Sequence, residues 1–403
     1  MSVAPLPLRR IVFLNRYYWP EEPATAQLLT DLAEALAAKG HPVTVITSRP
    51  AGSDVPKVEL HRGVVIHRMA GTRWARLGLS GKAVDFLFFQ LGALWQLLFT
   101  ARQDDAIVAL TDPPLLGVGV WLIARLCGAR VFHWVQDVFP ELAAELTGQR
   151  WLAVLQPLRN LAWRRSDGCV TLGSDMAATI ARAGVPASQI SISPNWAPAG
   201  LAGVPHAATD ALRAAWGLTG KFVVAYSGNL GRVHDFAPVL EVAEALRTET
   251  VIAFVFIGHG AQRQWLEAEA ARRALANLHF RPPQPRDRLA ASLLVGDLHL
   301  VTLRAGCEPF VFPSKLYGAA ALGRPVIFIG RRDCEIARLV EECRLGRAFT
   351  RDDVAAIAAT IRQWQAEPGR LAPLTAAATV FGQAHAGPAR AAMDWEQLLA
   401  ITG

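Results

Sequence analysis

The segment from Cys307 to Phe328 carries the residues best suited to chemistry. Its loop holds one acidic residue, Glu308, and Pro313 and Ser314 then open a helix. Free backbone amides at a helix start bind a diphosphate, and Lys315 in the first turn adds a full positive charge. Proline and serine there are also ordinary capping residues, and a loop carboxylate such as Glu308 can simply be solvated. Lys315 favours a functional role over a capping role for this segment, because a cation in the first turn is unfavourable with the helix dipole.

The elements that must position this segment alternate between strand and helix in two similar halves. The first half begins with an apolar strand at 11–15 and an amphipathic helix at 25–40. After a stretch rich in Pro, Ala and Gly at 194–208, the alternation restarts with FVVAYSG and VIAFVFIGHG. Apolar strands between amphipathic helices predict parallel sheets covered on both faces. The fold class is therefore α/β, with two Rossmann-like domains facing across a ligand-binding cleft.

The same alternation predicts the domain boundaries. An N-terminal Rossmann-like domain spans 1–195, with a candidate membrane-contact segment near 73–100. Residues 196–216 are predicted to be a linker, because Pro, Ala and Gly dominate there. A C-terminal Rossmann-like domain spans 217–384. The last segment, 385–403, is expected to form a helix that packs back toward the N-terminal domain.

Length and composition exclude several classes of protein. At 403 residues the chain exceeds the size at which one core usually stops growing. Its formal charge of +7 favours anionic partners, but no RNA-recognition, zinc-knuckle or helix-turn-helix pattern points to nucleic acid. Five cysteines without a C-x-x-C pair indicate free thiols, and the absence of a signal peptide predicts a cytoplasmic protein. No G-x-G-x-x-G follows the first strand, which disfavours NAD-dependent chemistry.

An apolar segment, FLFFQLGALWQLLF at 86–99, follows a basic stretch that contains no acid. The basic residues are Arg62, Arg68, Arg73, Arg76 and Lys82. The apolar segment is shorter than the roughly 20 residues that a span needs, so a buried or interfacial helix is favoured. Basic charge beside aromatic bulk suits a protein lying on an anionic membrane leaflet. A core-facing helix beside a solvated basic loop is the alternative.

Several motifs, taken in order, resemble glycosyltransferase family four, whose fold is GT-B. They are YYWPEEPATAQLLTDLAEALAAKGHPVTVIT, HWVQDVFPE, GSDM, YSGNLG, FVFIGHG, PSKLYG and GRPV. Together they extend over nearly the whole chain. The sequence is most similar to bacterial enzymes of O-antigen, colanic-acid and capsule assembly, including those that move N-acetylfucosamine-type sugars.

The resemblance implies roles for residues around the lysine. The family carries two glutamates, one near the donor sugar and one on the ribose hydroxyls, and Glu308 matches the first. Leu316 stands at the strict position of the second, and Gly318 stands where many relatives have it. Main-chain groups would therefore hold the ribose. Glu308 and Lys315 are predicted to be catalytic, with Ser314 and Leu316 at the donor.

The family also places basic residues after the strand that opens its second domain, where they bind the donor diphosphate. In YSGNLGRVHDF, Asn229 stands where many relatives have arginine. Arg232 is predicted to be the catalytic arginine, because a guanidinium pairs with phosphate through two hydrogen bonds and stays charged. A solvated loop arginine is the alternative. The other donor-binding candidates here are Gly228, Asn229, His234, Gly258 and Gly260.

On the acceptor side, Thr25 follows the position where many relatives have a Gly-Gly loop. It could contact the acceptor or could simply cap a helix. Gln136 and Asp137 stand where relatives often have His-Asp near the sugar. Gln136 cannot act as a base, so it would donate hydrogen bonds to sugar hydroxyls, and Asp137 could instead cap the following turn.

The resemblance implies a retaining glycosyltransferase that moves a hexosyl group, such as an N-acetylated deoxyhexosyl group, from a UDP-sugar to a polyprenyl-diphosphate-linked acceptor. Cationic side chains would neutralise the leaving group, so no metal and no cofactor are expected, and no D-x-D motif is present. The expected location is the inner face of the cell membrane, without nucleic-acid partners. Two alternatives remain: a nucleotide-sugar epimerase of the same fold, and a non-catalytic membrane-surface scaffold.

Overall fold

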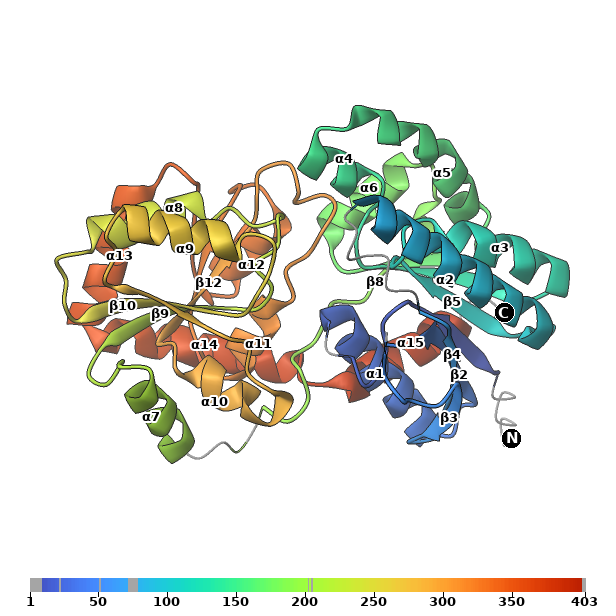
Figure 1. The fold of residues 1–403 in the computed structure, drawn as a ribbon, viewed down its shortest axis with the longest axis horizontal. Coiled ribbons are helices and arrows are strands. Elements are labelled where there is room, and N and C mark those ends of the chain that lie inside the picture. The colour runs from blue at the N-terminus through green and yellow to red at the C-terminus, as the bar shows by residue number, and fades with distance from the viewer. Residues whose placement is uncertain are drawn as a thin grey trace. The chain divides into compact units, whose positions relative to one another are not determined.

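The computed structural model describes residues 9–21, 23–50, 52–71, 79–201, 203 and 206–400. The chain divides into two compact units, each described by itself (Figure 1). The N-terminal unit comprises Met1–Pro194, Pro309–Val311 and Gly387–Gly403, and the C-terminal unit comprises Asn195–Glu308 and Phe312–Ala386. Each unit is a sheet with helices on both faces, as expected for the predicted α/β class.

The sheet of the N-terminal unit has the strand order β3-β4-β2-β1-β5-β6-β7-β8 and is parallel except for β3. Its strands are β1 Ile11–Leu14, β2 Val43–Ser48, β3 Val58–His61, β4 Val64–Met69, β5 Ala106–Leu110, β6 Arg130–Val135, β7 Gly168–Thr171 and β8 Ile190–Ile192. Its helices are α1 Ala24–Ala38, α2 Leu79–Thr100, α3 Leu116–Cys127, α4 Glu141–Thr147, η2 Arg150–Leu155, α5 Gln156–Arg164, α6 Ser174–Arg182, η3 Ala187–Gln189 and α15 Pro388–Ala400. Strands β1 and β5 are buried throughout, which is typical of parallel strands covered on both faces.

The sheet of the C-terminal unit is parallel, with the order β11-β10-β9-β12-β13-β14. Its strands are β9 Phe222–Ser227, β10 Ile252–Ile257, β11 Leu278–Arg281, β12 Leu298–Thr302, β13 Val326–Ile329 and β14 Gly346–Phe349. Its helices are α7 His206–Ala215, α8 Ala237–Ala245, α9 Arg263–Arg272, η4 Arg286–Arg288, α10 Leu289–Leu294, α11 Lys315–Ala321, α12 Glu335–Glu342, α13 Val354–Ala366, η5 Pro368–Arg370 and α14 Leu371–Ala384. Strand β9 lies between β10 and β12, so the turns that follow these strands share one edge of the sheet.

The segment 196–216, predicted to be a linker, contains the ten-residue helix α7. This helix packs against α10 and belongs to the C-terminal unit. Its sequence, HAATDALRAA, is rich in strong helix formers, and this local preference outweighs the Pro and Gly content just before it. The prediction of a linker along the whole segment is therefore wrong.

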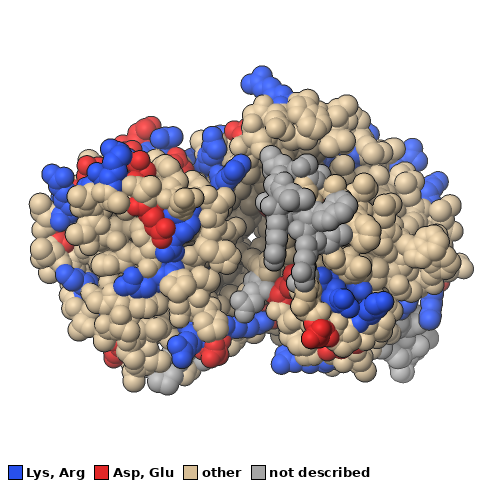
Figure 2. All heavy atoms as spheres, viewed as in Figure 1, with Lys and Arg blue, Asp and Glu red and all other residues tan. Residues whose placement is uncertain are grey.

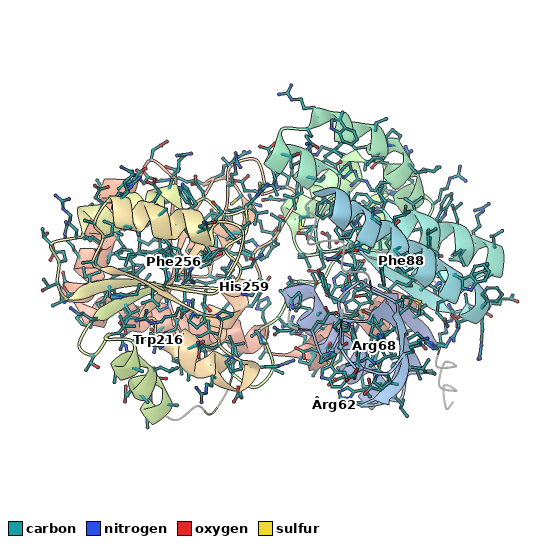
Figure 3. The ribbon with its side chains drawn as sticks, in the orientation of Figure 1. Arg62, Arg68, Phe88, Trp216, Phe256 and His259 are labelled. Carbon is teal, nitrogen blue, oxygen red and sulfur yellow. The ribbon has the colours of Figure 1, made fainter. Side chains whose placement is uncertain are left out.

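The basic stretch 62–82 fits the alternative of a solvated basic loop only in part. Arg62 and Gly63 form the two-residue turn of the β3–β4 hairpin, both at positive φ. Arg62 pairs with Glu34, and the buried Arg68 pairs with Glu59 at 2.6 Å. Both arginines are labelled in Figure 3. Residues 72–78, with Arg73 and Arg76, and the side chain of Lys82 lie outside the described residues.

Helix α2 contains the apolar segment 86–99 and is apolar on two opposite faces. Phe89, Ala93 and Leu97 are buried against the sheet, whereas Trp95 and Phe99 are exposed. The helix is therefore neither wholly core nor wholly surface. Within the described ranges, no helix is long and apolar enough to cross a membrane.

The C-terminal helix α15 belongs to the N-terminal unit and packs on α1. Its Trp395 is fully buried and makes edge contacts with Phe13 on β1 and Trp134 on β6, at 6.1 and 5.0 Å between ring centroids. Glu396 accepts hydrogen bonds from Lys39 and His41, the first and third residues after α1. Aromatic burial and two polar contacts thus attach the end of the chain to this sheet.

Candidate functional site

A lysine with two neutral partners stands at the carboxyl end of β9. Lys315, the first residue of α11, donates hydrogen bonds to Tyr226 Oη at 2.8 Å and to His234 Nε2 at 2.9 Å. Its Nζ also lies 4.6 Å from the centroid of the Tyr226 ring. A Cβ added to Gly228 would lie 3.3 Å from Lys315 Cε, so the glycine turn packs directly against the lysine.

The hydrogen bonds around Lys315 fix which atoms are donors. His234 Nδ1 lies 2.6 Å from the Thr302 carbonyl, so Nδ1 carries the proton and Nε2 presents its lone pair to the lysine. Tyr226 donates its hydroxyl proton to the Asn229 carbonyl at 2.8 Å. Two of the three ammonium N–H groups are thus used, which leaves one for a ligand.

The charge of Lys315 is not balanced by a carboxylate. Within the described part of the chain, no acidic side chain forms an ion pair with it, and burial lowers its pKa to about 7. Burial also lowers the pKa of His234 and raises that of Tyr226, so both partners stay neutral. An enclosed cation among neutral groups is a site for an anion.

The turns after β9 and β10 touch through their backbones, which only glycine allows. Gly258 has φ +146°, and a Cβ there would lie 2.0 Å from the Gly228 carbonyl oxygen. A Cβ on Gly260 would lie 2.6 Å from Asn229 Oδ1. Figure 3 labels His259, between the two glycines, and Phe256, within β10. The structure therefore brings Gly228, Asn229, Gly258 and Gly260 into one cluster beside Lys315.

Glu308 is buried in the loop between β12 and α11. Its Oε2 accepts a hydrogen bond from the Gly306 amide at 2.8 Å, and Oε1 is buried without a hydrogen-bond partner among the described residues. Burial raises the pKa of Glu308. The alternative of a solvated loop carboxylate is therefore wrong, because the side chain is only 5% exposed.

Three further donor-side candidates differ in how they are placed. Ser314 is the N-cap residue of α11, but its side chain forms no capping hydrogen bond. The side chain of Leu316 is fully buried, so it is not available to a ligand. Arg232 is exposed in the turn between β9 and α8, and no ion pair within the described residues involves it. Its guanidinium is therefore available to bind a ligand.

The acceptor-side candidates lie in the N-terminal unit. Helix α1 begins at Ala24 with Pro23 at its N-cap, so Thr25 does not cap it and that alternative is wrong. Gln136 is buried just after β6. Asp137 lines a pocket with Thr111, and its amide donates a hydrogen bond to Thr111 Oγ1. Burial, with a smaller contribution from Asp112, raises the pKa of Asp137 to about 7.

Comparisons with known proteins agree with this architecture. The model described as "Glycosyl transferase 4-like domain" matches residues 25–196, and "Glycosyl transferases group 1" matches residues 208–379. The putative colanic acid biosynthesis glycosyl transferase WcaI of Escherichia coli (strain K12) is 28% identical over 373 residues, 88% of this chain and 91% of the relative. The probable glycosyltransferase WbjE of Pseudomonas aeruginosa is 26% identical, covering 88% of this chain and 89% of the relative.

Solved structures share the fold. HepE of Anabaena, in complex with UDP-glucose, matches with a TM-score of 0.76 at 17% identity, covering 97% of this chain and 99% of that one. WaaG, a glycosyltransferase involved in lipopolysaccharide biosynthesis, matches with a TM-score of 0.68 at 15% identity, covering 97% and 99%. The chain is a glycosyltransferase of the GT-B fold, with a 4-like domain at 25–196 and a group 1 domain at 208–379. The predicted family and fold class are confirmed.

The sequence interpretation of this glycosyltransferase missed Tyr226. The motif YSGNLG drew attention to its glycines, whereas the tyrosine looked like one more aromatic residue of a buried strand. Its position directly before the turn was the available signal, because the carboxyl ends of parallel strands carry ligand-binding groups.

A second group of missed residues follows β1 and β5 of the glycosyltransferase. Arg16 Nε lies 3.3 Å from Asp112 Oδ1, and its guanidinium covers the Tyr17 ring at 4.3 Å. Burial raises the pKa of the nearby Glu21 to about 7, although Arg16 opposes the shift. Arg16 and Asp112 each stand two residues after an apolar strand, which is the signal that could have identified them.

The described residues of the glycosyltransferase contain no group of three or more His, Cys, Asp or Glu side chains that could hold a metal ion. A cation and a glycine turn lie at the carboxyl end of β9, and a buried carboxylate lies in the loop between the neighbouring strand β12 and α11. This set can bind an anionic group and orient a polar one beside it.

Proposed function

We propose that this enzyme is a retaining, metal-independent hexosyltransferase. It would move a hexosyl group, such as an N-acetylated deoxyhexosyl group, from a UDP-sugar to a polyprenyl-diphosphate-linked acceptor in cell-surface polysaccharide synthesis. The observation that carries the proposal is the enclosed Lys315 ammonium, which has neutral partners and one unused N–H group. A nucleoside diphosphate supplies the negative charge that this lysine lacks.

In the proposed reaction, the bond between the anomeric carbon and the diphosphate oxygen breaks, and a bond from the acceptor hydroxyl oxygen to that carbon forms. Lys315 and the uncommitted Arg232 neutralise the charge that develops on the departing diphosphate. The hydroxyl proton goes to a departing phosphate oxygen on the same face of the sugar, which gives retention. Glu308 orients the donor sugar, and no cofactor takes part.

Two observations on related proteins support the choice of donor and product. HepE of Anabaena, which shares the fold, has been solved with UDP and with UDP-glucose. WcaI, the relative at 28% identity, carries colanic acid biosynthesis in its name. A polysaccharide built on a lipid carrier requires the acceptor to stay at a membrane, so we place the enzyme on the inner face of the cell membrane. Gln136, Asp137 and Thr25 would contact the acceptor or the transferred sugar.

A nucleotide panel tests the donor site. Purified wild type and the Lys315→Ala variant are heated with UDP, GDP, ADP or TDP, without metal and with EDTA. We expect UDP alone to raise the Tm of the wild type, by roughly 2–4 °C at a hundredfold excess over Kd, and to leave the variant unchanged. A flat panel on folded wild type would rule out the donor site, and stabilisation that requires a divalent metal would rule out metal independence.

The affinity for a UDP-sugar should fall as the pH rises through 7. The free lysine has a pKa of about 7, and a bound diphosphate favours its charged form, so binding takes up a proton above that pH. The affinity then falls by up to about tenfold per pH unit, and it is level below pH 6. Tyr226 on β9 and His234 after it, the titratable groups that contact Lys315, stay neutral over this range.

Calorimetry with UDP-glucose between pH 6 and 9, in two buffers of different ionisation enthalpy, measures both the affinity and the proton uptake. UDP-glucose is the suitable probe because its diphosphate does not titrate in this range. The Lys315→Met variant should bind weakly and with the same affinity at every pH. A wild-type profile that is level from pH 6 to 9 would contradict the unbalanced charge on the lysine.

A further inference from the structure

The outward face of helix α2 is a continuous apolar stripe. Among the side chains of α2 that the structure describes, seven large apolar ones are exposed: Val84, Leu87, Phe88, Leu91, Trp95, Leu98 and Phe99. Their spacing places them within an arc of about 120° on the helix. Trp95 is 67% exposed and packs its ring against Phe99, 4.8 Å away. A stripe of this length on the outside of a helix needs an explanation, because the opposite face already fills the core.

The stripe continues onto neighbouring helices of the same unit. Helix α3 packs against both α2 and α5, and η2 leads directly into α5. These elements expose six more large apolar side chains: Leu122, Leu126, Trp151, Val154, Leu158 and Leu161. We call this set, with the seven residues of α2, the apolar helical face. Figure 2 shows a broad surface over α2 and α3 with few charged atoms, which gather at its edges.

Arginines border the apolar helical face. Arg125 stands beside Leu126 and one turn after Leu122, and Arg165 follows Leu161 by one turn. The exposed arginines on or directly beside these helices are Arg102, Arg125, Arg150, Arg164 and Arg165, and the exposed acids are Asp104 and Glu145. No ion pair within the described residues involves these five arginines. Their long side chains can lie along apolar groups with the guanidinium at the edge.

We propose that the apolar helical face binds the surface of an anionic phospholipid bilayer, with α2, α3 and α5 lying along it. Exposed tryptophan and phenylalanine enter the boundary between head groups and acyl chains, and the arginines contact lipid phosphates. A second copy of the chain fits less well. A twofold contact would place the same arginine-rich edges opposite each other, and the described residues there include only two exposed acids to balance them. The proposal names a partner for the proposed function but depends on this surface alone.

Vesicle flotation tests the proposal with the full-length protein. The vesicles are phosphatidylcholine with and without phosphatidylglycerol. The apolar variant combines Trp95→Ser, Phe99→Ser and Trp151→Ser, and the charge variant combines Arg125→Gln with Arg165→Gln. The matched control combines Trp265→Ser with Val380→Ser, which removes exposed apolar side chains from the C-terminal unit. UDP-induced thermal stabilisation is measured on every variant, so that a folding defect or a failed donor site is seen separately.

We expect the wild type and the matched control to float with the anionic vesicles. The apolar variant should bind them about tenfold more weakly, and the charge variant should lose the preference for phosphatidylglycerol. Two results would overturn the proposal: wild type that floats with neither vesicle, or an apolar variant that floats as well as the control. Sedimentation could instead find that the wild type is a dimer and that the apolar variant is a monomer. If that wild-type dimer also failed to float with vesicles, the apolar helical face would be assigned to a second copy of the chain.

Discussion

Replacing Lys315 by methionine should lower kcat/KM for sugar transfer by about a thousandfold while the folded protein becomes no less stable. The ammonium is the enclosed cation that would neutralise the departing diphosphate, and one such donor typically contributes about a hundredfold to a thousandfold. Methionine occupies a similar volume without a charge. Because no acidic side chain among the described residues pairs with Lys315, its removal also ends the cost of burying a lone cation.

Initial rates with a UDP-sugar and a lipid-linked acceptor, together with urea unfolding, measure the two halves of this prediction. Lys221→Met is the matched control. Lys221 precedes β9, whereas Tyr226 and the glycine turn lie at the other end of that strand. The control should therefore keep its rate. Comparable rate losses in both variants, or a Lys315→Met protein that is active but unstable, would show that the lysine serves the fold and not the reaction.

The sequence was sufficient to predict those site residues whose positions are set by adjacent residues in the chain. Lys315 follows Pro313 and Ser314 at a helix start, and the glycines follow apolar strands. Local sequence fixes such positions, because the strand must end and the chain must turn there. The same logic predicted the α/β class, since apolar runs and amphipathic helices alternate over both halves.

Contacts between segments that are far apart in the chain could not be predicted from the sequence. Arg62 and Arg68 looked like charges available to a membrane, but their partners Glu34 and Glu59 come from α1 and β3. The hairpin that brings these residues together was itself missed. An ion pair depends on which strands become neighbours, and a list of charges does not contain that information.

For helix α2, too, the sequence alone did not determine which side chains are buried. Its composition indicates a helix that is apolar all round, which is consistent with a core element or with a surface that binds something apolar. Only the structure shows that Leu97 faces the sheet while Trp95 faces outward. The basis for the proposed membrane contact thus moves from the basic stretch before α2 to the apolar helical face and the arginines that border it.

Substituting alanine for Gly258 should destabilise the C-terminal unit by about 3 kcal/mol or more and abolish nucleotide binding. The residue has φ +146°, and the new Cβ would lie 2.0 Å from the Gly228 carbonyl oxygen, which is backbone and cannot rotate away. The turn after β9 would have to move. Gly228 packs against Lys315, so this movement reaches the cation that is proposed to bind the diphosphate.

Gly220→Ala is the control, because Gly220 also has a positive φ, +73°, in the same unit, but no atom lies within 4 Å of its added Cβ. It carries backbone strain without a collision and should cost about 1 kcal/mol with UDP affinity retained. Urea unfolding followed by the intrinsic tryptophans gives the free energies, and calorimetry gives the affinities. If the two variants unfold at similar urea concentrations and bind UDP equally, the backbone contact between the two glycine turns does not hold the site together. A large difference confined to Gly258→Ala means that this contact sets the position of the turn on which Lys315 rests.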